Sequence, residues 1–185
     1  VFVLVPAIAW LVGFGAAIIP LSWTAPAATV NSLTVSSQNI KAGSGSAVES
    51  ARELASMGSD VIALQELDAG GALRVTSALR TKYPYHFDVG TVGVWSKYPL
   101  SQSQSLDLGL GWKRALTTQV ETKNGSVRLY AIHAASARQN DHGNRDEMLA
   151  QLASTLRSDK SPAVIAVGDF NATSTDRAFL PLTET

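Results

Sequence analysis

The sequence of 185 residues contains no cysteine, and its first forty residues contain no aspartate, glutamate, lysine or arginine. The absence of cysteine excludes disulfides, thiolate metal sites and cysteine nucleophiles. Acidic and basic residues are equal in number, at 15 each, so the chain as a whole lacks a strongly basic nucleic-acid footprint. The phosphate-binding P-loop, the G-x-S-x-G nucleophile elbow and the H-E-x-x-H zinc motif are also missing.

The longest apolar run is the opening stretch VFVLVPAIAWLVGFGAAIIPLSW. A helix needs about 20 apolar residues to cross a bilayer. We therefore predict a transmembrane-like anchor over residues 1–23 and a linker over 24–32, with a buried core helix of a soluble protein as the alternative. No lysine or arginine follows the run before Lys41, and positive charge favours the cytoplasmic side. The pattern favours a cell-membrane protein whose domain, residues 33–185, lies on the extracytoplasmic side.

Helical and strand patterns alternate through that domain. Apolar residues recur at helical spacing in residues 46–58, 71–83 and 144–158. Short apolar runs are typical of strands in residues 32–40, 60–67, 85–90, 92–100 and 162–170. Residues 114–122 and 126–134 alternate as in a hairpin, where Asn124 and Gly125 would supply the positive φ angles of a tight turn. The order predicts a layered α/β or α+β sandwich with mixed sheets rather than a Rossmann fold or a barrel.

Polar residues that can perform chemistry lie at or near the ends of four predicted strands: Asn39, Glu66, His133 and the pair Asp169 and Asn171. Each also has an ordinary explanation, as a capping asparagine, a surface glutamate, a hydrogen-bonded core histidine or an Asx turn. Together, their carboxylate and amide oxygens suit Mg²⁺, and their N–H groups suit a phosphoryl oxygen that gains charge. The combination favours metal-assisted hydrolysis over acyl transfer.

The stretches SQNI, DVIALQEL, GVWSKYPL, LYAIHAAS and AVGDFNAT resemble, in order and spacing, those of the endonuclease/exonuclease/phosphatase superfamily, which includes deoxyribonuclease I. They extend over residues 33–173, and the apolar N-terminus resembles that of the membrane-anchored bacterial branch. The resemblance implies a four-layer α/β/β/α sandwich. It also implies that an activated water attacks a phosphate ester with the help of Mg²⁺, or of Mn²⁺ in its place.

The same resemblance implies a role for each candidate residue. Glu66 resembles the metal-binding glutamate, and Asn39 the amide beside it. His133 resembles the histidine that hydrogen-bonds the scissile phosphate or protonates the leaving group. Asp169 resembles the aspartate that orients the nucleophile, and Asn171 the amide that orients the phosphate.

The chain departs from the superfamily after Asn171, because the Asp-His pair that supplies the general base in family members does not follow. The letters NDHG at residues 140–143 precede the GDFN motif and lie in a predicted loop. We therefore expect the chain to be about the first two-thirds of a catalytic domain, incomplete at its C-terminus. Such a fragment should bind metal poorly, catalyse little and leave its last strands unpaired.

These motifs do not distinguish nucleases from lipid phosphodiesterases or phosphomonoesterases. The neutral charge disfavours a processive DNA binder, and the apolar N-terminus favours a membrane-associated enzyme that acts on an envelope or lipid-linked phosphate ester. We expect this enzyme to be monomeric. A basic rim is a further possibility, although solvated surface charge explains the same residues: Arg74, Arg80, Lys82, Lys113 and Arg114. A hypothesis from another class is a membrane-tethered binding module that kept the sandwich and lost the chemistry.

Overall fold

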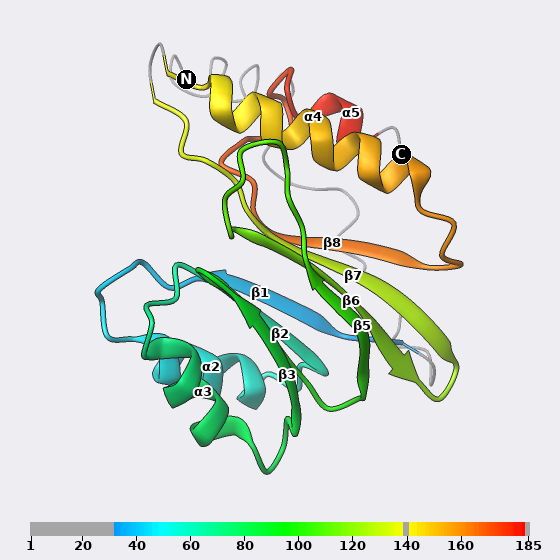
Figure 1. Cartoon of the computed structure of the whole chain (residues 1–185). Coiled ribbons are helices and arrows are strands. Elements are labelled where there is room, and N and C mark those ends of the chain that lie inside the picture. The colour runs from blue at the N-terminus through cyan, green and yellow to red at the C-terminus, as the bar shows by residue number, and fades with distance from the viewer. Residues whose placement is uncertain (1–31, 139–140, 184–185) are drawn as a thin grey trace, which may run out of the picture. The chain divides into compact units, whose positions relative to one another are not determined.

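The computed structural model describes residues 32–138 and 141–183, which form two four-stranded mixed sheets with helices packed outside them (Figure 1). The predicted anchor over residues 1–23 lies outside the described residues. Within the described part of the chain, no helix has both the length and the apolar character that crossing a membrane requires.

The first sheet has the strand order β1-β2-β4-β3. Its strands are β1 (Val35–Asn39), β2 (Val61–Gln65), β3 (Tyr85–Val89) and β4 (Val92–Ser96). β1 and β2 are parallel, whereas β4 pairs antiparallel with both β2 and β3. Every residue of β2 and β4 is buried, which explains why these strands have continuous rather than alternating apolar sequences.

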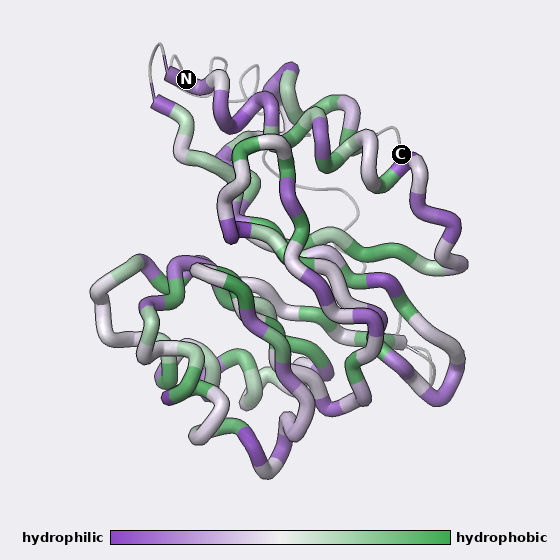
Figure 2. The backbone as a smooth tube through the Cα atoms, viewed as in Figure 1, coloured by the Kyte–Doolittle hydropathy of each residue, from purple (hydrophilic) through white to green (hydrophobic). Residues whose placement is uncertain are grey.

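The second sheet has the strand order β5-β6-β7-β8. Its strands are β5 (Leu100–Ser105), β6 (Ala115–Thr122), β7 (Gly125–His133) and β8 (Val164–Asp169). β5, β6 and β7 are antiparallel neighbours, and β8 pairs parallel with β7. In Figure 2 the turn between β6 and β7 is hydrophilic, whereas the middle of β8 is hydrophobic. The mixed sheets predicted from the sequence are thus confirmed.

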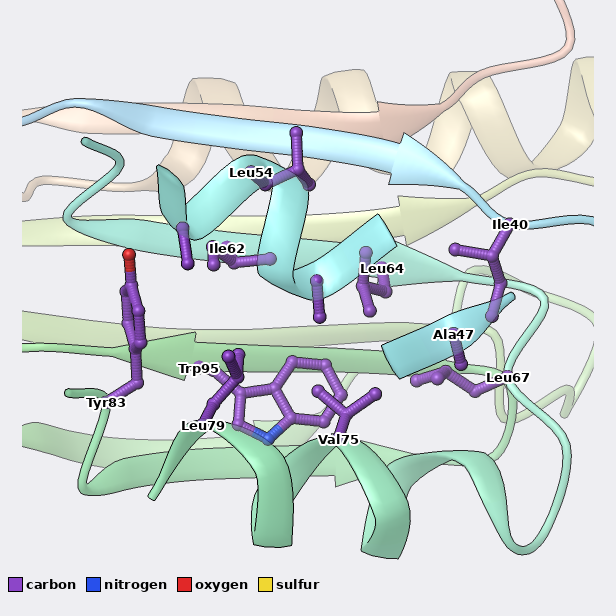
Figure 3. Packing of buried hydrophobic residues seen from close by; sticks show 12 residues of the cluster. Ile40, Ala47, Leu54, Ile62, Leu64, Leu67, Val75, Leu79, Tyr83 and Trp95 are labelled. Carbon is purple, nitrogen blue, oxygen red and sulfur yellow. The ribbon is translucent and has the colours of Figure 1, made fainter. Parts of the chain in front are cut away.

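Three hydrophobic cores separate four layers. Helices α2 (Ala47–Ser56) and α3 (Gly71–Leu79) cover the first sheet, and Figure 3 shows Trp95 and Tyr83 among the buried side chains of the core that these helices form with it. A second core, which includes Val94 and Leu129, fills the space between the sheets. Helices α4 (Gly143–Ser158) and α5 (Leu180–Thr183) cover the second sheet through a third core. The resulting layer order is α/β/β/α.

Three details differ from the sequence predictions. β5 was not anticipated, because its sequence LSQSQS has one apolar residue and lies half-exposed at a sheet edge. In the hairpin, Thr122 pairs with Gly125, so Lys123 and Asn124 form the turn; Gly125 has a positive φ of 122°, whereas Asn124 does not. The expectation of unpaired last strands is wrong for β8, which pairs with β7 over its whole length and is open only at its outer edge among the described strands.

Candidate active site

Two pairs of parallel strands place the candidate residues at neighbouring strand ends. In the first sheet, Asn39 ends β1 opposite Gln65, and Glu66 follows directly. In the second sheet, His133 ends β7 directly opposite Asp169, which ends β8. Parallel strands end at the same edge of a sheet, and the two sheets pack face to face through their common core. The structure therefore brings together polar residues that are up to 130 positions apart in the sequence.

Asn39 connects the carboxylates of the two sheets. Its Nδ2 donates to Glu66 Oε1 at 2.8 Å and to Asp169 Oδ2 at 2.8 Å. Its Oδ1 accepts a hydrogen bond of 2.9 Å from the Lys41 backbone N–H. The sequence predicts that Asn39 binds a metal through its oxygen, but in the structure the amide nitrogen faces the carboxylates. Asn39 thus acts as a donor that fixes two acids in place.

Glu66 is stabilised in its ionised form. The backbone N–H of Ala42 donates to Glu66 Oε2 at 2.6 Å. This hydrogen bond, then that from Asn39 and the positive charge of Arg114, lower the pKa of Glu66 below its ordinary value. The side chain is 28% exposed. Glu66 therefore offers a negatively charged oxygen to the site at neutral pH.

The backbone is left-handed at two of the candidate residues. Glu66 has φ 64° and Asn171 has φ 48°. Asparagine adopts this conformation readily, whereas for glutamate it costs about 1–3 kcal/mol and is concentrated at functional sites. At Gly168 the approach of β8 to β7 excludes any side chain, because a Cβ atom there would lie 1.9 Å from the carbonyl oxygen of Ile132. These conformations direct the residues after β2 and β8 into the site.

His133 is 5% exposed and lies against Arg114. Arg114 Nη2 is 3.0 Å from His133 Nδ1 and 2.6 Å from Nε2, and Thr91 Oγ1 is 3.2 Å from Nδ1. Burial and then the charge of Arg114 lower the pKa of His133, although Asp169 and Glu66 oppose the shift. The environment therefore favours neutral imidazole, which accepts from Arg114 at one nitrogen and donates from the other.

Arg114 was treated in the sequence analysis as rim or surface charge, yet it belongs to this cluster. Its pKa is lowered by burial, while Glu66 and Asp169 favour its charged form. The hairpin pattern in the sequence already indicates the position of Arg114. When the pairing of Thr122 with Gly125 is extended along β6 and β7, Arg114 falls opposite His133, where its carbonyl accepts the His133 N–H at 2.8 Å.

Asn171 follows β8 in an Asx-type turn, with its backbone N–H donating to Asp169 Oδ1 at 2.9 Å. Its side-chain Nδ2 donates to the carbonyl of Ala134 at 3.0 Å, and its own carbonyl accepts from Arg145 Nη1 at 2.9 Å. Arg145, whose side chain is 7% exposed, also binds the carboxylate of Asp176. The structure is thus compatible with both interpretations of Asn171, as a residue of an ordinary turn and as a functional amide. Arg145, which the sequence pattern did not indicate, fixes this turn.

One group of side chains has the chemistry and spacing of a metal site. Ligand atoms of Glu66, His133 and Asp169 all lie within 4.8 Å of one another. Two carboxylates that supply hard oxygens fit Mg²⁺ or Mn²⁺. Among the residues that the structure describes, no second group of this kind is present, and Asp141 and His142 of the NDHG segment do not join it.

Two mixed sheets packed face to face, with acids, amides and a histidine at their joined strand ends, form the arrangement of metal-dependent phosphoester hydrolases with a deoxyribonuclease I-like fold. Comparison with family models identifies the family. Residues 36–185 match the Endonuclease/Exonuclease/phosphatase family, and the chain belongs to it. The members of this superfamily are metal-dependent phosphoester hydrolases.

Solved structures agree with this assignment at the level of fold. A beta toxin of Staphylococcus aureus with bound magnesium ions has a TM-score of 0.65 at 18% identity, covering 82% of this chain and 69% of the toxin. Sphingomyelinase C of Streptomyces griseocarneus has a TM-score of 0.67 at 22% identity, covering 82% and 68%. D. rerio TDP2, complexed with a single-strand DNA product, has a TM-score of 0.68 at 20% identity, covering 82% and 64%. No curated protein matches the sequence.

Proposed function

We propose that this chain carries the phosphodiester hydrolase site of a Mg²⁺-dependent enzyme, in which an activated water attacks a phosphate ester. The observation that carries the proposal is the group of Glu66, His133 and Asp169, whose ligand atoms come from both sheets and lie within 4.8 Å of one another. The backbone at two of the three is unusual: Glu66 has a positive φ of 64°, and Asp169 directly follows Gly168, where no side chain fits.

In this proposal Glu66 and Asp169 would hold the metal, whose charge when bound stabilises the phosphoryl oxygens in the transition state. The hydrogen bonds from Ala42 and Asn39 keep the Glu66 carboxylate ionised and oriented. Asp169 orients the attacking water. The second N–H of the Asn171 amide, beyond the one bound to the Ala134 carbonyl, is the donor to the phosphate.

His133 acts as a hydrogen-bond donor to the phosphate rather than as an acid. A lowered pKa, caused first by burial and then by Arg114, disfavours the protonated imidazole that a leaving group would need. Of the two roles that the family resemblance offers for this histidine, the environment supports the first.

We further propose that residues 1–23 anchor the enzyme in the cell membrane with its domain on the extracytoplasmic side, and that its substrate is an envelope or lipid-linked phosphodiester. The support is the charge-free apolar sequence of that segment, which has the length of a membrane span. Fractionation of cells that express the full-length protein tests the anchor. Detergent should be needed to release the protein, and release by salt alone would contradict the proposal.

Hydrolysis of bis(p-nitrophenyl) phosphate by the full-length protein tests the chemistry. We expect activity with Mg²⁺ or Mn²⁺, its loss in EDTA, and a fall of at least about 100-fold in Glu66→Ala, because metal-based charge stabilisation supplies several kcal/mol. Glu53→Ala is the matched control, since this glutamate is exposed on α2. Absence of EDTA-sensitive activity, with no effect of Glu66→Ala, would instead support a non-catalytic binding module.

The same assay with a monoester, DNA and sphingomyelin in place of the diester tests the substrate class. Preference for an envelope or lipid-linked diester supports the proposal. Preference for DNA would make the protein a nuclease and would refute the envelope substrate while leaving the metal-dependent chemistry intact.

A further inference from the structure

A small pocket lies beside the group of Glu66, His133 and Asp169 and takes no part in the hydrolysis proposed for these residues. Its volume is about 220 Å³, and its lining includes Trp112, Arg114, Ser136, Arg138 and Asn144. We call it the Trp112 pocket. Arg114 belongs both to this pocket and to the cluster, because its Nη2 contacts the His133 ring at 2.6 Å. A group bound in the pocket is therefore next to a group bound at His133.

Arg114 is positioned to bind an anion from the pocket side. One of its terminal nitrogens contacts His133, and its Cζ lies over the ring of Trp112 at 5.6 Å from the ring centroid. Its other terminal nitrogen, Nη1, has no hydrogen-bond partner among the described residues. A guanidinium fixed on two sides loses little conformational entropy when it binds an oxyanion through its remaining N–H groups.

The charge of the pocket also favours an anion. Its lining contains two arginines, Arg114 and Arg138, and one acid, Asp141. Arg138 and Asp141 pair through their backbones, N–H to carbonyl in both directions at 3.0 Å, and no ion pair joins their side chains in the described structure. Ser136 and Asn144 add uncharged hydrogen-bonding groups with no intramolecular partner among the described residues. The lining therefore has a net positive charge, beside the residues at which we propose that the scissile phosphate binds.

We propose that the Trp112 pocket is a subsite for a second phosphate group of the substrate, adjacent to the phosphate that is cleaved. The proposal rests on the proposed function, since it takes the cluster of Glu66, His133 and Asp169 as the place of cleavage. It selects substrates that carry two neighbouring phosphates over diesters with a cationic head group, because a cation would face two guanidinium groups there. Two such phosphates can be separated by a sugar, as in nucleic acid, or joined directly, as in a diphosphate ester.

Calorimetric binding to the full-length protein with Mg²⁺ present tests the subsite without turnover. The ligands are thymidine 5′-monophosphate, thymidine 3′,5′-bisphosphate and thymidine 5′-diphosphate, which share one nucleoside and differ only in the second phosphate. We expect at least one of the two doubly phosphorylated ligands to bind about tenfold or more tightly than the monophosphate, as one charge-assisted hydrogen bond provides. The better of the two identifies the spacing of the phosphates. The advantage should shrink as salt rises.

Arg138→Gln is the test variant, because this exposed arginine has no side-chain partner whose loss would disturb the fold. We expect it to reduce the tenfold advantage to less than about threefold. Arg52→Gln, an exposed arginine on α2, is the matched control and should keep the full advantage. Equal binding of all three nucleotides by the wild-type protein, or an unchanged advantage in Arg138→Gln, would overturn the subsite.

These outcomes separate the two proposals. EDTA-sensitive hydrolysis of a simple diester without a preference for the second phosphate refutes the subsite and leaves the proposed function standing. A preference for the second phosphate that Arg138→Gln removes, without hydrolysis of any diester, supports the pocket as an anion site and refutes the proposed function.

Discussion

Replacing Gly168 by alanine should destabilise the protein more than alanine at a glycine with no neighbour close to its Cβ position, because two separate costs coincide there. Gly168 has φ 137°, a conformation that L side chains rarely adopt. In addition, a Cβ atom would lie 1.9 Å from the carbonyl oxygen of Ile132, an atom of the neighbouring strand β7 that cannot move aside alone. β8 would therefore have to separate from β7 next to the pair His133 and Asp169.

The size of the effect follows from these two terms. The strained conformation costs about 1–3 kcal/mol, and forcing an extra methyl group into a closed space costs about 1–3 kcal/mol more. We expect a loss of about 4 kcal/mol in the free energy of unfolding. Two other glycines separate the terms. At Gly43, with φ 74° and no atom within 4 Å of the added Cβ, only the strain remains, at about 1–2 kcal/mol. At Gly143, the first residue of α4, neither applies, and alanine should be neutral or stabilising by up to about 1 kcal/mol.

Urea or guanidinium unfolding of the three variants and the wild type, followed by circular dichroism, measures these differences. The expected order of loss is Gly168→Ala, then Gly43→Ala, then Gly143→Ala. If Gly168→Ala costs no more than Gly43→Ala, then the close approach of β8 to Ile132 does not constrain the fold, and our account of how Asp169 is placed is refuted.

Three further predictions concern the metal, the turn after β8 and the second sheet. Glu66→Gln should weaken Mn²⁺ binding by at least about tenfold in calorimetry, because it removes a charged ligand, and unchanged affinity would contradict the site; Glu53→Gln, on the exposed face of α2, should bind as wild type. Arg145→Met should lower the free energy of unfolding in denaturant by about 2 kcal/mol. This is less than the loss expected for a fully buried ion pair, because the side chains of its partners Asp176 and Asp146 are 28% and 35% exposed; a cost under about 0.5 kcal/mol would refute its role in fixing the turn. Tyr130 has a pKa raised to about 12 by burial and by its hydrogen bond to Asp159. The contribution of this tyrosine to the free energy of unfolding is therefore complete below about pH 10 and falls by about 2 kcal/mol as pH rises towards 12. The free energies of unfolding of wild type and Tyr130→Phe should converge over that interval, and a constant difference between them would show that Tyr130 does not cause the pH dependence.

Most elements of the fold were predictable because their signals are local. The strands at residues 61–65 and 164–169, the first fully buried and the second partly buried, are short apolar runs, and α2 and α4 have apolar residues at helical spacing. β5 escaped prediction because an edge strand with one half-exposed face needs few apolar residues. Its pairing partner is β6, which also pairs with β7 in the hairpin.

The candidate site was predictable in its residue types but not in its hydrogen bonds. Asn39, Glu66, His133 and Asp169 were recognisable as polar residues at the ends of apolar strands, and the structure gathers all of them. The orientation of the Asn39 amide was not recognisable, because it depends on the Lys41 N–H, which becomes available through the left-handed backbone at that residue.

The sequence by itself determined that this chain has a mixed α/β fold, that it belongs to a family of phosphoester hydrolases, and which strand ends carry acids and amides. These properties depend on residue spacing of two, three or four, and on short motifs. The register of the hairpin already places Arg114 opposite His133, but only the tertiary structure decided that the Arg114 side chain lies against the imidazole ring and that Arg145 binds the Asn171 carbonyl. Arginine carries no local signal that separates a surface charge from a buried one. Their positions follow only once strand register and the packing of α4 on the second sheet are fixed.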